Sequence, residues 1–405
     1  MTERKPRIAV VSPFIDKQHG TERPVAEWLN RAAESFDIHI YSQHVEDLDL
    51  SRMVWHRIPK IPGPHLLNYV WWFVANHVWR AWDKRFRGLK ADLVYTPGIN
   101  CLDADVISVH IMFAELLRRN LPSMRLSKHP VREWPRLLHR QLYYRLILKL
   151  ERHIYRNPGV TLIVIARRVS DGLQRFYGRK NPSSVLYFGL DREIFNPQRR
   201  LELREVARRE LRLGSDEFAL LLIGNDWLNK GLPLLLEVMG RLRKLPLHLL
   251  VVGTDNPSPY QSTIRDNSLA GRIHFLPPRK DVEYYYAAAD AYTGPSREDA
   301  LPLPPAEAMA CGLPVIVTSQ CGVSEIIVDG EDGLIMQDAF NADDLAAKVR
   351  QLYENHALRQ QLSEKAAETA QQYNWERSGR EFVDLLLQAV RTKNLAAGTE
   401  LPREA

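Results

Sequence analysis

The sequence AYTGPSREDALPLPPAEAMACGLPVIVT, at residues 291–318 of a chain of 405, is the clearest indication of the fold. Its two ends, Ala291–Thr293 and Pro314–Thr318, are apolar runs that predict β-strands. Between them, Pro304–Pro305 suits the first positions of a helix, where a missing backbone N–H costs little, and Gly312 suits the position just after a helix end. The stretch therefore predicts a strand, a loop, a helix of roughly two turns and a second strand.

Further short apolar runs lie on either side of this stretch and alternate with helical segments. Their hydrophobicity is continuous, which is typical of strands buried on both faces of a parallel sheet. Such alternation predicts doubly wound α/β domains, whose ligands bind outside the carboxyl ends of the strands. The runs are Arg7–Ser12, Ile38–Tyr41, Leu93–Tyr95, Val106–Val109, Thr161–Ile165 and Val185–Tyr187 in the first half, and Phe218–Ile223, Leu247–Val252 and Ile273–Leu276 in the second.

The length of the chain exceeds the size at which one hydrophobic core keeps growing, so we expect two domains. The charged segment 189–212 has no strand character and separates the two series of strands. The first domain is therefore predicted to span residues 1–188 and the second residues 189–373. A C-terminal helix is expected at about residues 374–390, and the polar residues 394–405 are expected to form a mobile tail.

Composition excludes several classes of protein. With 45% hydrophobic and 26% charged residues, the chain is typical of soluble globular proteins. Its three cysteines are too few for a disulfide framework and have no metal-ligand spacing, as expected in a reducing compartment. The apolar run Ile8–Val11 is too short for a signal peptide, and polar residues interrupt the aromatic-rich segment His65–Phe86, so we expect a cytoplasmic protein without a membrane span.

Positive charge is concentrated in one segment. The formal net charge is +6, yet residues 116–156 contain nine Arg and two Lys against two Glu, a local balance of +9. The segment 65–87 adds tryptophans, phenylalanines and four further basic residues. Such an aromatic and cationic face favours an anionic membrane surface. The alternative is a set of core tryptophans beside a solvated arginine face; nucleic acid is not expected, because no recognition motif accompanies the charge.

The loop before the helix at Pro304 has the properties of an anion site. It leads into a helix N-terminus at the carboxyl edge of the sheet, where free backbone N–H groups suit a diphosphate. Glu298 and Asp299 lie at the start of the loop and Glu307 in the first turn of the helix, so their carboxylates can accept hydrogen bonds from the hydroxyls of one ligand. The alternative is that Glu307 only complements the helix dipole and that the loop carboxylates are solvated.

These residues resemble the signature of the retaining family 4 glycosyltransferases, also called glycosyl transferases group 1: an acidic residue, seven others, a Glu, then Ala-Met-Ala-x-Gly-x-Pro-Val. This chain has EAMACGLPV from Glu307 onward. The resemblance extends to Gly322–Gly330, Gly224–Gly231 and Gly20–Arg23. It implies the GT-B fold, in which two Rossmann-like domains face each other across a cleft. It also implies an acceptor site on the first domain, a donor site on the second, and a C-terminal helix that returns to the first.

The resemblance implies roles for the acidic residues of the stretch. Glu307 would bind the ribose of the nucleotide, and Glu298 or Asp299 would meet hydroxyls of the donor sugar. The family usually has Glu where this chain has Asp299, with Glu298 one place earlier, so the choice between the two stays open. The backbone N–H groups of Leu301 and Leu303 would face the diphosphate, while the proline between them stands where the family commonly has Gly.

Lys230 lies between the predicted strand Phe218–Ile223 and an apolar helix, where it can neutralise a leaving diphosphate. The alternative is an exposed lysine at a helix start. In the family an Arg commonly accompanies this Lys, but the corresponding positions here hold Asn225 and Asn229. Asn225 is kept as a donor-binding candidate, and a second cation would have to come from elsewhere. The candidates for it are Arg167, Arg279 and Arg297.

The resemblance implicates two residues of the first domain. Gly20 precedes a predicted helix and would let the backbone approach the diphosphate; the family often has two glycines here, and the first is replaced by His19. His110 ends the strand Val106–Val109 and resembles a family His that contacts the donor sugar near the reacting carbon. The alternatives are a glycine kept for turn geometry and a histidine bonded into the domain edge.

The predicted function is that of a retaining, metal-independent glycosyltransferase of cell-envelope polysaccharide synthesis. It would move a hexosyl group from a nucleotide-diphosphate sugar, with a UDP-sugar favoured, to a glycan, lipid-linked or small-molecule acceptor. No metal-ligand cluster is evident, so no metal or other cofactor is expected. No enzymic nucleophile stands out, which favours front-face attack. The enzyme would be cytoplasmic, with peripheral contact to the inner face of the membrane. A nucleotide-sugar epimerase and a non-catalytic sugar-nucleotide-binding module are the alternatives.

Overall fold

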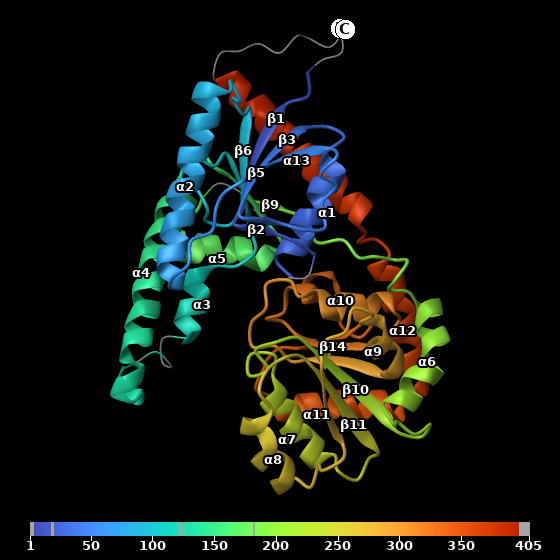
Figure 1. Ribbon diagram of the computed structural model, residues 1–405. Helices are drawn as coiled ribbons and strands as arrows, with labels where there is room; N and C mark the ends of the chain where they lie inside the picture. The colour runs from blue at the N-terminus through green and yellow to red at the C-terminus, as the bar shows by residue number, and fades with distance from the viewer. Residues whose placement is uncertain (1–3, 18–19, 121–123, 125, 181–182, 397–405) are drawn as a thin grey trace. The chain divides into compact units, whose positions relative to one another are not determined.

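The computed structural model describes residues 4–17, 20–120, 124, 126–180 and 183–396. The chain forms two compact units (Figure 1). Unit 1 consists of Met1–Tyr187 together with Trp375–Ala405, and unit 2 consists of Phe188–Asn374. The division between Tyr187 and Phe188 lies next to the predicted boundary. Each unit is a Rossmann-like α/β domain and is described by itself.

Unit 1 is built on a seven-stranded sheet in which all strands are parallel, in the order β5-β3-β1-β6-β7-β8-β9. Strands β1, β6 and β7 lie near its centre, so their carboxyl ends share one edge of the sheet. The small pair β2 and β4 lies apart from this sheet. The strands are β1 (Arg7–Val11), β2 (Phe14–Ile15), β3 (Asp37–Ser42), β4 (His44–Val45), β5 (Met53–Arg57), β6 (Leu93–Pro97), β7 (Val106–Val109), β8 (Thr161–Val164) and β9 (Ser184–Val185).

The helices of unit 1 pack in two groups. Helix α1 packs on α13, whereas α4 packs on α2, α3 and α5. Within the described ranges, no helix is long and apolar enough to cross a membrane. The helices are α1 (Glu22–Ala32), α2 (His65–Phe86), α3 (Phe113–Asn120), α4 (Trp134–Arg156), α5 (Arg167–Tyr177) and α13 (Trp375–Ala396), with short 3-10 turns η2 (Leu126–Lys128) and η3 (Val131–Glu133).

The C-terminal helix α13 belongs to unit 1, although it follows unit 2 in the chain. The indole of Trp28, on α1, stacks on Phe382 with ring centroids 5.1 Å apart, and its Nε1 donates to the Ser378 hydroxyl at 2.8 Å. The helix runs to Ala396, so the expectation of a tail from residue 394 is wrong for residues 394–396. Residues 397–405 lie outside the described residues.

Unit 2 is built on a six-stranded parallel sheet in the order β12-β11-β10-β13-β14-β15. Its strands are β10 (Phe218–Ile223), β11 (Leu247–Val252), β12 (Ile273–Leu276), β13 (Ala291–Gly294), β14 (Val315–Thr318) and β15 (Leu334–Met336). Its helices are α6 (Pro197–Glu210), α7 (Leu232–Arg241), α8 (Gln261–Asp266), α9 (Glu283–Ala288), α10 (Leu303–Ala310), α11 (Ala342–Glu354) and α12 (His356–Ala370), with turns η4 (Ser258–Tyr260) and η5 (Gly322–Ile326).

The burial of the central strand β10 on both faces explains why the strands of this sheet appear in the sequence as continuous apolar runs. All six of its residues are buried, and their side chains alternate between two hydrophobic clusters. Leu221 belongs to the cluster with α9 and α10, whereas Leu220 and Leu222 belong to the cluster with α7 and α11. The sheet is therefore covered on both faces, which leaves its carboxyl edge as the place for polar residues.

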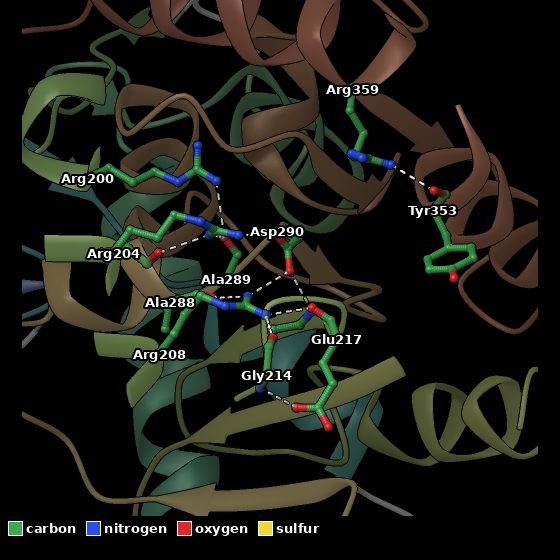
Figure 2. A network of polar contacts seen from close by, with 12 residues as sticks. Arg200, Arg204, Arg208, Gly214, Glu217, Ala288, Ala289, Asp290, Tyr353 and Arg359 are labelled. Carbon is green, nitrogen blue, oxygen red and sulfur yellow. Dashed lines mark hydrogen bonds and ion pairs between the residues drawn. The ribbon is translucent and has the colours of Figure 1, made fainter. Parts of the chain in front are cut away.

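Three arginines of α6, spaced four residues apart, fix α6 to the end of α9 (Figure 2). Arg204 and Arg208 each form an ion pair with Asp290, at 2.5 and 3.1 Å. Arg200 and Arg204 donate to the carbonyl of Ala289, at 3.1 and 2.9 Å. They satisfy carbonyls that the short helix α9 leaves without partners at its C-terminus. The charged segment 189–212 thus anchors the start of β13, the strand that leads into the predicted anion site.

Each of the predicted strands is present, and no end shifts by more than two residues. Among the strands of three or more residues, β5 and β15 were not predicted. Strand β5 combines Met53 and Trp55 with His56 and Arg57, so it does not form an apolar run. Strand β15 has only three residues. Both lie at the outer edge of a sheet, where burial is incomplete and the sequence signal is weaker.

Candidate donor and acceptor sites

The loop between β13 and α10 is held by main-chain hydrogen bonds to its neighbours at the carboxyl edge of unit 2. The N–H of Arg297 donates to the carbonyl of Asn229 at 2.8 Å, and the N–H of Asp299 donates to the carbonyl of Gln320 at 3.0 Å. The carbonyl of Asp299 accepts from Gly322 N–H at 2.9 Å. These contacts join the loop after β10, the loop before α10 and the segment after β14 into one site.

Lys230 and Asp299 form a buried ion pair in this site. The ammonium nitrogen lies 2.5 Å from Asp299 Oδ2, and the two side chains are 13% and 20% exposed. Burial disfavours the charged ammonium, but the attraction of Asp299 outweighs it and raises the pKa of Lys230 above its ordinary value. Glu298 is held differently, because its main-chain carbonyl accepts from Asn229 Nδ2 at 2.8 Å. The structure therefore brings Asp299, through its side chain, to Lys230.

Two glycines permit this close packing. At Gly224, a Cβ would lie 2.9 Å from Lys230 Cε, and at Gly231 a Cβ would lie 2.4 Å from the carbonyl oxygen of Pro295. Both glycines also have positive φ angles, 130° and 87°, which side chains disfavour. Sequence reasoning included them in the resemblance but did not identify their steric role.

Glu307 lies on α10 with only 5% of its surface exposed. Its Oε2 accepts a hydrogen bond of 2.7 Å from the hydroxyl of Tyr286, on α9. Helix α10 begins at Leu303, so Glu307 is its fifth residue, and the expectation that it lies in the first turn is wrong by a fraction of a turn. Leu301 and Leu303 lie half-buried at the entrance to the helix. Sequence reasoning missed Tyr286, because nothing in its local pattern links it to a residue on another helix.

Asn225 and the candidates for a second cation lie in different surroundings. Asn225 Oδ1 accepts from the N–H and the hydroxyl of Thr254, at 2.9 and 3.1 Å, which ties the ends of β10 and β11 together. Arg279 is held by a two-point contact with Asp281. Arg297 lies in the loop before α10 with its guanidinium 5.0 Å from the ring centroid of Phe340. Arg297 thus shares the loop of Asp299, but its guanidinium packs on Phe340; Arg167 belongs to unit 1.

His110 lies at the carboxyl edge of the sheet in unit 1. It follows β7 and is 6% exposed. Its Nε2 lies 3.0 Å from the hydroxyl of Ser108, which in turn lies 2.8 Å from that of Tyr95. Its ring centroid is 5.9 Å from that of Trp28. Burial lowers the pKa of His110 to about 4, so the imidazole is neutral at pH 7.

A cavity of about 450 Å³ opens beside His110, within unit 1. Asn68, Tyr69 and Trp72 line it from the N-terminal half of α2, and Ser12 and other residues line it from the strand ends. Its volume falls within the range of small-ligand pockets. Gly20 is exposed just before α1. Residue 19, where the family often has a glycine, lies outside the described residues.

Comparison with known sequences places part of the chain in a family. Residues 204–369, within unit 2, match the family model "Glycosyl transferases group 1". The lipopolysaccharide glucosyltransferase WaaG of Escherichia coli K12 is 29% identical over 166 residues, which are 40% of this chain and 44% of WaaG. A D-inositol 3-phosphate glycosyltransferase of Thermomonospora curvata is 29% identical over 235 residues, 53% of each chain. The matches thus span about half the length of these curated relatives.

Comparison with solved structures extends over almost the whole chain. The crystal structure of WaaG superposes with a TM-score of 0.74 at 20% identity and covers 93% of this chain and 99% of WaaG. Anabaena HepE, solved in complex with UDP-glucose, superposes with a TM-score of 0.69 at 16% identity and covers 94% of this chain and 99% of HepE. At these identities the likeness shows the fold, which is GT-B. Residues 204–369 thus match the group 1 glycosyl transferases, and the whole chain has the GT-B fold.

Proposed function

We propose that the protein is a retaining, metal-independent glycosyltransferase that moves a hexosyl group from a nucleotide-diphosphate sugar to a sugar-containing acceptor. The observation that carries the proposal is the buried pair of Lys230 and Asp299 at the entrance to α10, with Glu307 further along that helix. A cation, two carboxylates and a helix N-terminus meet the requirements of a diphosphate that is linked to two sugars.

In the proposed donor complex, Lys230 binds the diphosphate together with the N–H groups of Leu301 and Leu303. Asp299 holds the ammonium in place and accepts hydrogen bonds from hydroxyls of the sugar. Glu307 accepts from the ribose hydroxyls, and Asn225 lies at the neighbouring strand ends. Tyr286 supports this role, because its hydrogen bond to one oxygen of Glu307 fixes the carboxylate for the other.

Catalysis in this proposal depends on stabilising the negative charge that develops on the leaving diphosphate. Lys230 supplies a fixed positive charge in a buried site, where electrostatic effects are stronger than in water. His110 is neutral at pH 7, so its ring nitrogens can exchange hydrogen bonds with a sugar hydroxyl without adding charge. The acceptor hydroxyl attacks on the face that the leaving group departs from, and its proton goes to a phosphate oxygen.

The comparisons favour a UDP-sugar as the donor. HepE was solved with UDP-glucose, and WaaG is named as a glucosyltransferase of lipopolysaccharide. For the acceptor we propose a glycan or a lipid-linked sugar of cell-envelope polysaccharide synthesis, bound in the cavity beside His110. The cavity wall has tyrosine and tryptophan rings and only two charged side chains, Glu22 and Lys60, which suits a hydroxyl-rich ring.

We also propose that unit 1 contacts the anionic inner face of a membrane. Exposed apolar residues follow one ridge of α2 at intervals of four, and three more lie on α4. Basic residues accompany them on both helices. Apolar side chains between cations are typical of surfaces that rest in the lipid headgroup region. The ridge is formed by Val70, Val74, Val78, Trp82 and Phe86, and α4 adds Trp134, Leu138 and Leu142.

The experiment that tests the proposed reaction follows the anomeric configuration of the product by NMR. The full chain is incubated with α-linked UDP-sugars and a panel of saccharide acceptors in the presence of EDTA. We expect transfer of one sugar with an α-linked product, because front-face attack retains configuration. A β-linked product, or activity that EDTA abolishes and a divalent cation restores, would contradict the proposal.

A further inference from the structure

A second cavity in unit 1 lies between the edge strand β5 and the C-terminal half of α2. Its volume is about 520 Å³, and none of its lining residues lines the cavity beside His110. This size suits a ligand of a few sugar rings or a similar small molecule. Half of the lining residues are charged or histidine, and most of the others are tryptophans. The proposed reaction does not use any of them.

The floor of this cavity is a fixed polar pair. Asp83, 4% exposed, lies with Oδ2 2.9 Å from His56 Nδ1 and accepts a hydrogen bond of 3.0 Å from the hydroxyl of Tyr41. His56 Nε2 lies 2.8 Å from His39 Nδ1. Burial lowers the pKa of His56 more than the nearby carboxylate raises it, so the ring is neutral at pH 7. These polar groups are therefore in place before any ligand arrives, which reduces the entropy lost on binding.

The walls of the cavity are indole rings held by their own contacts. Trp55 Nε1 donates to a main-chain carbonyl of β3 at 3.1 Å. The ring of Trp79 lies edge-on to Trp71 with centroids 6.5 Å apart, and the ring of Trp82 lies 4.3 Å from that of Phe86. The electron-rich faces of such rings attract the polarised C–H groups of a pyranose. Fixed indoles beside hydrogen-bonding groups are a combination that suits saccharides.

The charge around the cavity favours an anionic ligand. Arg57 is exposed, with its guanidinium 5.8 Å from the ring centroid of Trp55. Arg87 is 63% exposed and lies 3.2 Å from Asp83 Oδ1. The cavity is therefore lined by two guanidinium groups and one carboxylate, and that carboxylate already has other partners. The excess positive charge can bind a phosphate or a carboxylate in the two-point manner of arginine.

Helix α2 connects the two cavities of unit 1. Trp72 lines the cavity beside His110, and Trp79 lines the second cavity seven residues later. Seven residues of helix span about 10 Å, a distance that a glycan of a few sugars covers. An acyl chain fits the second cavity less well, because it would leave charged and imidazole groups without water or partners.

We infer that the second cavity binds an anionic saccharide, a phosphorylated or uronate-bearing part of the acceptor glycan at some distance from its reacting end. The choice of a glycan rests on the proposed transferase function. The inference assigns the sugar rings to Trp55, Trp79 and Trp82, and the anionic group to Arg57 and Arg87. The inference predicts that the enzyme selects its acceptor through a negatively charged group that binds in the second cavity, away from the reaction site.

Calorimetric titration of the full chain tests this inference. The probes are tetrasaccharides that carry one phosphate or one uronate, each paired with its neutral counterpart. We expect an anionic probe to bind more tightly than its neutral counterpart. Arg87→Ala should weaken that binding by about tenfold, the usual loss of a charge-assisted hydrogen bond. Trp82→Ala should weaken both members of the pair.

Each variant has a matched control on the same helix. Arg85→Ala removes the same charge from an exposed residue outside the cavity, and Val74→Ala truncates an exposed side chain of the apolar ridge outside the cavity. Both controls should leave saccharide binding unchanged. The inference is overturned if no probe binds at millimolar concentration, or if Arg85→Ala and Arg87→Ala weaken binding equally. It is also overturned if Arg87→Ala weakens binding to phosphatidylglycerol vesicles more than Arg85→Ala does, while no saccharide distinguishes the two variants.

Nucleotide-sugar binding, measured on the same preparations, separates this inference from the proposed function. Intact nucleotide-sugar binding without saccharide binding would remove the second cavity from the account and leave the transferase. Saccharide binding that depends on Arg87, without binding of any nucleotide sugar, would remove the transferase and leave the second cavity.

Discussion

The carboxyl edges of the two sheets differ in charge although the two units share one architecture. In unit 2, Lys230 and Asp299 form a buried ion pair and Glu307 lies buried on α10. In unit 1, His110 is neutral at pH 7, and the cavity beside it is lined mainly by aromatic, aliphatic and uncharged polar side chains, with Glu22 and Lys60 as its charged residues. The parallel sheet thus fixes where a ligand can bind, and the residues at the strand ends decide its charge. We interpret the charged edge as a diphosphate site and the neutral edge as a sugar site.

The largest expected effect comes from Lys230→Ala. The substitution removes the fixed charge that would stabilise the leaving diphosphate and leaves Asp299 buried without its ammonium partner. We expect kcat/KM for transfer to fall by about a thousandfold, the upper range for one electrostatic contact in an active site. Lys244→Ala, at an exposed position of the same unit, is the control. A fall of less than threefold would remove the charged edge from the mechanism.

His110 should show its neutral state through the pH dependence of stability. Its pKa of about 4 in the folded protein lies below the ordinary value of 6.5, so the unfolded chain binds a proton that the folded chain does not. The stabilisation is complete above pH 6.5 and is lost as the pH falls toward 4. Between pH 7 and pH 5 this amounts to about 2 kcal/mol. The measurement is urea unfolding of the wild type and His110→Asn at both pH values.

Because other titrating groups are common to both proteins, the difference in unfolding free energy isolates His110. We expect the stability advantage of the wild type over His110→Asn to shrink by about 2 kcal/mol at pH 5. An advantage that stays constant would mean that the pKa of His110 is the same in the folded and the unfolded protein, and an advantage that grows at pH 5 would mean that the folded protein favours the charged imidazolium.

Arg297→Ala tests whether the charged edge has a second cation. Arg297 lies in the loop of Asp299, whereas Arg279 is engaged with Asp281. We expect Arg297→Ala to lower kcat/KM by about tenfold, and Arg279→Ala to have little effect. The comparison uses initial rates at several ionic strengths. Equal effects of the two variants would leave Lys230 as the cation of the site.

Tyr286→Phe should have the smallest effect. The hydroxyl fixes the carboxylate of Glu307, and its loss removes one hydrogen bond but no charge. We expect KM for the nucleotide sugar to rise by about fivefold with kcat nearly unchanged. Tyr285→Phe is the control, since its hydroxyl donates to the carbonyl of Pro277 instead. A fall in kcat without a change in KM would assign Tyr286 to a different step.

The sequence predicted those features that depend on local pattern. The apolar run Phe218–Ile223 is found as β10 with the same ends, because a strand buried on both faces needs an apolar residue at every position. The GT-B fold is confirmed, and residues 204–369 match the predicted family. The edge strand β5 was missed, because a strand at the outer edge of the sheet tolerates His56 and Arg57.

Contacts between distant residues could not be predicted in this way. Lys230 and Asp299 lie 69 positions apart, and their pairing depends on how two loops fold against each other. The hydrogen bond between Tyr286 and Glu307 depends on the packing of α9 against α10. The roles of the site residues stay predictions, as do the cleft between the domains and the contact with a membrane.

The central claim is that unit 2 binds a nucleotide-diphosphate sugar through Glu307 and Lys230. A thermal-shift screen of nucleotide diphosphates and nucleotide sugars, with the wild type, Glu307→Ala and the exposed control Glu331→Ala, tests it most directly. A ligand at a hundred times its Kd stabilises the folded state by about 2.7 kcal/mol. We predict that one nucleotide sugar raises the Tm of the wild type and of Glu331→Ala, and that Glu307→Ala loses most of this shift. No shift with any nucleotide, or an equal shift in all three proteins, would contradict the claim.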